Sequence, residues 1–194
     1  MNKTGTRVIE TERLILRPLT VDDAEDMYRN WASDPEVTKY LTWPPHPDAE
    51  LTRALLKDWV SRYEAGDFFN WAIVWKKTGE VIGNISVVSL TEQIGAAEIG
   101  YCMGRRFWGQ GIMPEALLAV EDYLFETVGL LRICAGHDVN NPKSGRVMDK
   151  AGMTREGVLR QSGKNNQGIV DVEIHSILRG EWEERRKGGS RESR

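Results

Sequence analysis

Residues 101–116 read Tyr101-Cys-Met-Gly-Arg-Arg-Phe-Trp-Gly-Gln-Gly-Ile-Met-Pro-Glu-Ala116, in which a predicted strand enters a glycine-containing loop and then an amphipathic helix. The first amide groups of a helix lack intrahelical partners and lie at the positive end of its dipole, so they bind phosphate well. Gly109 and Gly111 allow a close approach, and Arg106 can supply a cation. The segment predicts a phosphate or pyrophosphate site, with a glycine-rich turn that binds no ligand as the alternative.

Two well-known phosphate loops do not fit this segment. A Walker loop requires Gly-Lys-Ser/Thr, whereas Gly111 is followed by Ile112 and Met113. A dinucleotide fingerprint requires GxGxxG after the first strand of a βαβ unit, whereas this loop reads Gly-Gln-Gly-Ile-Met-Pro and follows strands that look like a meander. The sequence therefore disfavours both nucleotide hydrolysis and dinucleotide binding.

Hydrophobic periodicity predicts an α/β protein with a mixed (α+β) arrangement. Three consecutive strands joined by short polar turns imply an antiparallel meander, and Thr20 with Asp23 resembles a capping box. The predicted strands cover about 13–18, 69–75, 81–90, 97–103, 131–135 and 170–178, and the predicted helices about 21–33, 51–63, 113–128 and 144–151. With one further strand, to which we assign no bounds, between 151 and 170, the resulting order is β, α, α, β, β, β, α, β, α, β, β.

The length of 194 residues predicts one domain, which we place at 1–182. Residues 183–194 are charged and offer little to bury, so we expect a solvated tail there. A net charge of -3 gives no positive field for nucleic acid. No apolar run reaches the roughly 18 residues that span a membrane, and no signal peptide is evident, so we expect a cytoplasmic protein.

Cysteine and histidine usage argues against a disulfide framework and against a metal site. Cys102 and Cys134 each lie in an apolar stretch outside any Cys/His motif. His46, His137 and His175 are widely separated in the sequence. We therefore expect no metal and interpret the histidines as ordinary buried or surface residues.

A family resemblance starts from Arg106-Phe-Trp-Gly109-Gln-Gly111, which matches the R/Q-x-x-G-x-G/A signature of the GCN5-related (GNAT) N-acetyltransferases. It continues through the opening TERLILRPL, the strand AEIGYCM, the helix beginning MPEA and the segment 137–153. Together these segments resemble the branch that includes the ribosomal-protein N-terminal acetyltransferases, from about Thr11 to Leu178.

The resemblance implies a mostly antiparallel sheet, flanked by helices and splayed between its fourth strand (97–103) and fifth strand (131–135). Acetyl-CoA would be the cosubstrate, with its pantetheine arm in the gap as a surrogate strand. The cosubstrate-binding positions that it implies are Tyr101, Met103, Arg106, Gly109, Gln110, Gly111, Ile112, Met113, Asn141 and Ser144.

Acetyl transfer to an amine needs a proton acceptor and a group that protonates the CoA thiolate. Glu98 is the candidate base because partial burial in an apolar strand would raise its pKa, with His137 or water as alternatives. An exposed strand face or a salt bridge would explain Glu98 equally well. Met148 stands where many members of the superfamily have a tyrosine acid, which leaves Ser144 or water as the acid unless Ser144 caps its helix. Tyr101 is a further hydroxyl, and a core aromatic is its alternative role.

The acceptor site is the least determined part. Trp31, Trp43 and the Pro44-Pro45 pair suit an extended peptide N-terminus such as that of a ribosomal protein, or else the core. A polyamine, an amino acid or an antibiotic amine is the alternative acceptor, and a catalytically silent acyl-CoA sensor is the alternative function. Homodimerisation is left open.

Overall fold

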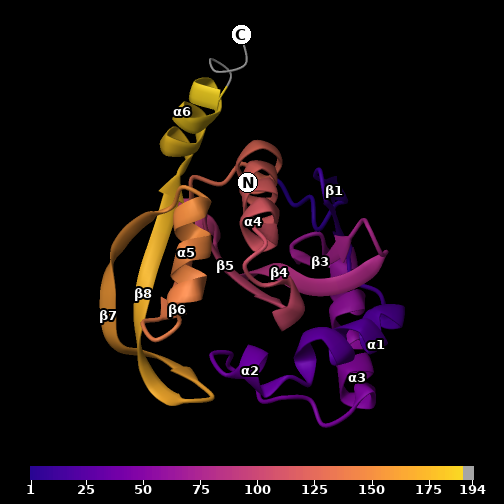
Figure 1. Cartoon of the computed structure of the whole chain (residues 1–194). Coiled ribbons are helices and arrows are strands. Elements are labelled where there is room, and N and C mark those ends of the chain that lie inside the picture. The colour runs from indigo at the N-terminus through magenta and orange to yellow at the C-terminus, as the bar shows by residue number, and fades with distance from the viewer. Residues whose placement is uncertain (190–194) are drawn as a thin grey trace.

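One eight-stranded sheet, in the order β1-β2-β3-β4-β5-β6-β8-β7, forms the centre of the computed structural model, which describes residues 1–189 (Figure 1). All neighbouring strands are antiparallel except β5 and β6. The strands are β1 (Ile9–Glu10), β2 (Leu14–Pro18), β3 (Asn70–Trp75), β4 (Glu80–Thr91), β5 (Ala96–Met103), β6 (Arg132–Asp138), β7 (Thr154–Asn165) and β8 (Gly168–Leu178).

The helices are α1 (Ala24–Met27), α2 (Pro35–Thr38), α3 (Ala49–Arg62), α4 (Ile112–Tyr123), α5 (Pro142–Lys150) and α6 (Arg179–Gly189). Helices α1 and α3 pack on one face of this sheet and α4 and α5 on the other, while α6 extends beyond the end of β8 (Figure 1). The predicted helix 21–33 is confirmed as α1 flanked by a 3₁₀ turn and a π turn, and the backbone N–H of Thr20 donates to Asp23 at 2.7 Å as the capping box requires. No described helix is long and apolar enough to cross a membrane.

The central strand β3 is buried on both faces. Ile73 packs into a core with α4, whereas Ala72 and Val74 pack into a second core with α1 and α3. Successive residues of a strand point to opposite faces, so one apolar run can serve both cores. This two-sided burial explains why β3 is apolar almost throughout, and the predicted strands 69–75, 81–90 and 97–103 are confirmed.

The sheet splays between β5 and β6, as the resemblance implies. The two strands pair only where residues 96–98 face residues 132–134. Beyond Glu98, β5 continues along β4 to Met103, and β6 continues along β8 to Asp138. The backbone edges of β5 and β6 therefore separate, and polar groups that a strand would satisfy are left facing a gap.

The predicted tail is helical as far as residue 189, where α6 ends, and its side chains from 183 to 188 are solvent-exposed except for Arg185; residues 190–194 lie outside the described part. Trp182 is only 5% exposed and packs on Phe125, while its indole N–H donates to Asp122 at 2.6 Å. Arg185 donates to the fully buried Glu121 at 2.9 Å. The composition of the tail does not reveal these contacts, because the acidic partners lie about sixty residues earlier in the sequence than Trp182 and Arg185.

The Glu121–Arg185 pair predicts a pH-dependent stability. Burial raises the pKa of Glu121 to about 7, against the opposing effect of Arg185. Between its ordinary pKa and about 7 the native state therefore holds more protons than the unfolded state, so this carboxyl's contribution to the unfolding free energy falls as pH rises. Arg185→Met removes the cation beside a buried carboxylate. It should therefore lower the free energy of unfolding by about 1–3 kcal/mol at pH 8 and by less at pH 5.

Urea unfolding at pH 5 and pH 8 measures this difference. The matched control is the double variant Arg185→Met/Glu121→Gln, in which position 121 can no longer ionise. The loss of stability that Arg185→Met causes in the Glu121→Gln background should therefore be the same at the two pH values. An equal loss of stability for Arg185→Met at both pH values would contradict the assignment.

Candidate active site

A cleft of about 940 Å³ opens where β5 and β6 separate. Its walls come from β4, β5, the loop that precedes α4, the end of β6, α5 and the segment 36–43. Among the residues predicted from the sequence, those that line the cleft are Glu98, Tyr101, Met103, Gly109, Gly111, Ile112, Met113, Asn141 and Ser144. The splay thus gathers residues from three separate segments of the chain around one space.

The loop before α4 needs glycine for its backbone conformation. Gly109 and Gly111 have φ values of 76° and 73°, in the left-handed region, and Gly111 is the N-cap of α4. Arg13 fixes the loop from outside, since its Nη1 donates to the carbonyl of Gln110 at 2.9 Å and its Nε to Glu115 at 2.6 Å. The first turn of α4 is thereby held with its amide groups at the cleft.

Arg106 and Gln110 are not among the residues that line the cleft. The Arg106 guanidinium donates to the side-chain oxygen of Asn30 at 3.1 Å and forms an ion pair with Glu80. Gln110 donates its side-chain amide to the carbonyl of Arg106 at 2.8 Å. Both side chains thus brace the loop against its surroundings, and Arg106 does not present a cation to the cleft in this structure.

The cleft instead receives cations from α5, which the sequence interpretation missed. Lys143, Arg146 and Lys150 all line it, and their spacing of three and four residues places them on one face of the helix. Lys143 Nζ lies 4.7 Å from the centroid of the Trp108 ring, on the opposite wall. The sequence carried a signal for these cations, namely basic residues at helical spacing directly after the predicted cosubstrate contact Asn141.

Tyr101 and Ser144 form one hydrogen-bonded unit across the cleft. The Tyr101 hydroxyl lies 3.0 Å from both the hydroxyl and the carbonyl oxygen of Ser144. Burial raises the pKa of Tyr101 well above its usual value, so the phenol stays protonated. Asn141, not Ser144, is the N-cap of α5, which removes the capping alternative for Ser144, and Met148 is buried in the core.

Glu98 lies at the last paired position before the strands separate, opposite Cys134 of β6. The pleat turns Ala97 and Ile99 into the core and leaves Glu98 exposed at the cleft, so the expected partial burial is wrong. Within residues 1–189 its carboxylate makes no ion pair or hydrogen bond, which argues against the salt-bridge alternative. A water molecule or an amine can therefore reach it.

His137 of β6 is among the residues that line the cleft, but its side chain is almost fully buried. Its Nδ1 lies 2.8 Å from the carbonyl oxygen of Asp138, and a Cβ atom at Gly145 of α5 would fall 2.7 Å from its Nε2. The ring also lies 5.6 Å, centroid to centroid, from that of His175. His137 and His175 are both buried, and although they are far apart in the sequence they are neighbours in the fold because β6 and β8 pair.

The acceptor side of the cleft contains one of the two expected tryptophans. Trp31 is fully buried in the core, as its alternative role required, while Trp43 and Tyr40 line the cleft. The Tyr40 hydroxyl donates to the carbonyl of Asn140 at 2.9 Å. Asn166, at the β7–β8 turn, donates to the carbonyls of Thr38 and Trp43 at 2.8 and 2.7 Å. These hydrogen bonds connect the segment 38–43 to residue 140 and to the β7–β8 turn.

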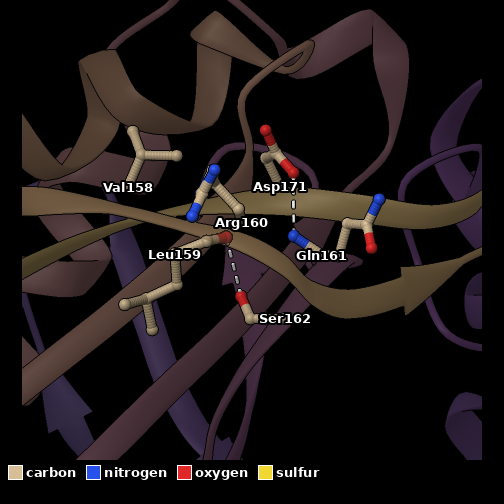
Figure 2. A pocket seen from close by; sticks show the side chains of 6 residues that line it. All are labelled: Val158, Leu159, Arg160, Gln161, Ser162 and Asp171. Carbon is tan, nitrogen blue, oxygen red and sulfur yellow. Dashed lines mark hydrogen bonds between the residues drawn. The ribbon is translucent and has the colours of Figure 1, made fainter.

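A second hollow lies on the β7–β8 hairpin and shares no lining residue with the cleft (Figure 2). It forms where the pairing shifts register between Leu159 and Gly163 and Gln161 adopts a φ of 51°. The backbone N–H of Gln161 donates to the carboxylate of Asp171 at 2.8 Å, and the Ser162 hydroxyl donates to the carbonyl of Leu159 at 3.0 Å. These bonds satisfy the bulge internally, so we assign it no chemistry.

Comparisons with known proteins agree with this geometry. Residues 13–154 match the model of the acetyltransferase (GNAT) domain. The chain is 35% identical over 172 residues to the uncharacterized N-acetyltransferase p20 of Bacillus licheniformis, covering 89% of this chain and 96% of that protein. It is 30% identical over 139 residues to the ribosomal-protein-serine acetyltransferase of Escherichia coli, covering 71% and 76%.

Among solved structures, a probable acetyltransferase superposes with a TM-score of 0.82 at 27% identity, covering 91% of this chain and 99% of that one. The family model spans well over half of the chain, and the splayed sheet, the glycine loop before α4 and the cleft are all present. The protein is therefore a member of the GNAT acetyltransferase family.

Proposed function

We propose that this acetyltransferase transfers the acetyl group of acetyl-CoA directly to the N-terminal α-amine of a protein, such as a ribosomal protein. The cleft at the splay carries the proposal, because it joins an anion-binding loop to an unpaired strand edge and ends at an exposed carboxylate. Members of this family use acetyl-CoA.

The lining of the cleft supports one orientation of acetyl-CoA. Its pyrophosphate suits the amide groups at Gly109, Gly111 and the first turn of α4, with Lys143 and Arg146 as counter-charges. Its pantetheine amides suit the free edge of β5 beyond Glu98, so the thioester is directed toward the point where the strands part. Asn141, at the start of α5, lies between these two regions of the lining.

The loop predicts a binding test with Gly111→Val. Wild-type protein at about 100 times the dissociation constant of CoA should gain roughly 2.7 kcal/mol, seen as a higher melting temperature. A β-branched residue at a φ of 73° distorts the turn that presents the amide groups, so the variant should lose this shift.

Gly79→Val is the matched control, because Gly79 has a φ of 74° at the β3–β4 turn outside the cleft. It should be strained to a similar degree and still respond to CoA. The proposed binding mode would fail if CoA left the melting temperature of the wild type unchanged or raised that of Gly111→Val equally.

Glu98, Tyr101 and Ser144 divide the proton transfers between them in the proposed mechanism. The neutral amine attacks the thioester carbonyl, and Glu98 accepts its proton directly or through water. The Tyr101–Ser144 pair then donates a proton to the departing thiolate, whose bond to carbon breaks. Burial raises the pKa of the Cys102 thiol in the same cleft to about 12, so it stays protonated and unsuited to an acetyl-enzyme route.

Glu98→Gln should lower turnover by about 10² to 10⁴ with little change in CoA affinity, since it removes a base and keeps the shape. The acidic limb of the rate–pH profile should flatten with it. Glu92→Gln, an exposed carboxylate just before β5, is the control and should keep the wild-type profile. Wild-type turnover in Glu98→Gln would show that the proton passes to water or to another group.

Tyr101→Phe and Ser144→Ala separate the acid from a binding contact. Removal of the thiolate acid should lower turnover and leave the acidic limb intact, whereas loss of a pantetheine contact should mainly weaken CoA. Similar effects of both variants on turnover are expected from their 3.0 Å hydrogen bond. No loss of turnover in either variant would leave water as the proton donor.

Two observations support a peptide N-terminus as the acceptor: the aromatic side chains of Tyr40 and Trp43 line the cleft, and the Escherichia coli relative is named a ribosomal-protein-serine acetyltransferase. Short peptides with free α-amines should therefore release CoA faster than spermidine, free lysine or the same peptides blocked at the N-terminus. Preference for spermidine would reassign the enzyme to small-molecule amines, and absence of turnover with every amine would favour an acyl-CoA sensor.

A further inference from the structure

We propose that His137, Glu173 and His175 form a binding site for a transition metal ion of the Zn²⁺ class, beneath α5. His137 on β6 is directly opposite Glu173 on β8. His175 follows Glu173 by two residues and so points to the same face of the sheet. Strands that are far apart in the sequence thus place two imidazoles and a carboxylate together.

The spacing of the donor atoms suits a single ion. Nε2 of His137 is 3.6 Å and Nε2 of His175 is 3.8 Å from the same carboxylate oxygen of Glu173, and the three donor atoms lie within 4.8 Å of one another. Tetrahedral Zn²⁺, with bonds of about 2.0–2.2 Å, holds neighbouring ligand atoms roughly 3.3–3.5 Å apart. Small side-chain movements therefore complete the geometry.

His137 is already oriented as a ligand. Its Nδ1 lies 2.8 Å from the Asp138 carbonyl, to which an N–H at that position donates, leaving the Nε2 lone pair free. This Nε2 is buried and has no hydrogen-bond partner, and the side chain is only 5% exposed. A buried acceptor without a donor calls for a ligand, and a cation between His137 and Glu173 would satisfy it.

The surroundings of Glu173 and His175 supply charge and access. Arg155 donates to the second oxygen of Glu173 at 2.9 Å, which leaves the first oxygen for an ion. Asp149 of α5, 3.3 Å from Nε2 of His175, adds a carboxylate that is 62% exposed and opens to solvent. Two imidazoles with carboxylates favour Zn²⁺, Co²⁺ or Ni²⁺ over Mg²⁺ or Ca²⁺.

An ion here would tie α5 to the sheet. Gly145 approaches His137 so closely that a side chain there would collide with the ring, so the helix and the cluster pack as one unit. The same helix carries Ser144 and Lys143 into the cleft. This site departs from the expectation of no metal drawn from the sequence, and it is independent of the acetyl acceptor.

The test uses full-length protein freed of metal, titrated with Co²⁺ and with Zn²⁺. We expect one ion bound per chain, a visible Co²⁺ absorption band typical of four-coordination, and a higher melting temperature with Zn²⁺. His137→Gln and His175→Gln should lose all three signals, whereas His46→Gln, which removes the histidine outside the cluster, should keep them.

Glu173→Gln decides the question if the histidine variants do not fold, because Glu173 is partly exposed and the substitution keeps its shape. It should weaken Zn²⁺ binding by on the order of tenfold or more, whereas Glu156→Gln, another carboxylate paired with an arginine but on the opposite face of the sheet, should not. Wild-type protein that binds no ion, or unchanged affinity in Glu173→Gln, would overturn the proposal.

Discussion

The separation of β5 from β6 after three paired residues is the constraint on which the rest of the structure depends. A sheet normally satisfies its own backbone groups, and a strand edge turned into the interior of a protein needs another partner. This chain keeps both strands in the sheet by pairing them on their outer sides, β5 with β4 and β6 with β8. The gap is therefore built into a rigid frame and does not rely on a mobile loop.

The loop that closes one end of the gap is held by residues distant in the sequence. Arg13, beside the first long strand, ties Gln110 and Glu115 together, and Arg106 joins the loop to Glu80 and Asn30. Left-handed glycines give the turn its shape, while these arginines fix its position against the rest of the sheet. Arg13 and Arg106 therefore hold the loop in place, and the basic side chains of α5 line the cleft, where an anion would bind.

Most of the fold was predictable, because periodicity in 69–103 reports burial on one or both faces of each strand and turn residues mark the hairpins. Gly109, Gly111, Tyr101 and Ser144 were also found, since local motifs carry them. The exposure of Glu98, the ion pair of Arg106 with Glu80 and the helical state of the C-terminal segment were not predicted, because these environments depend on the tertiary fold. The pairing of His137 with His175 likewise follows from the β6–β8 register, which no local pattern encodes.

One short helix faces both the cleft and the histidine cluster. α5 presents Ser144 and Lys143 to one and Gly145 and Asp149 to the other within nine residues. A rigid rod of that length cannot shift at one face and stay still at the other. Binding at one face that shifts α5 would therefore change the affinity at the other, and such linkage is reciprocal: whatever factor one occupant imposes on the affinity of the other, it receives in return.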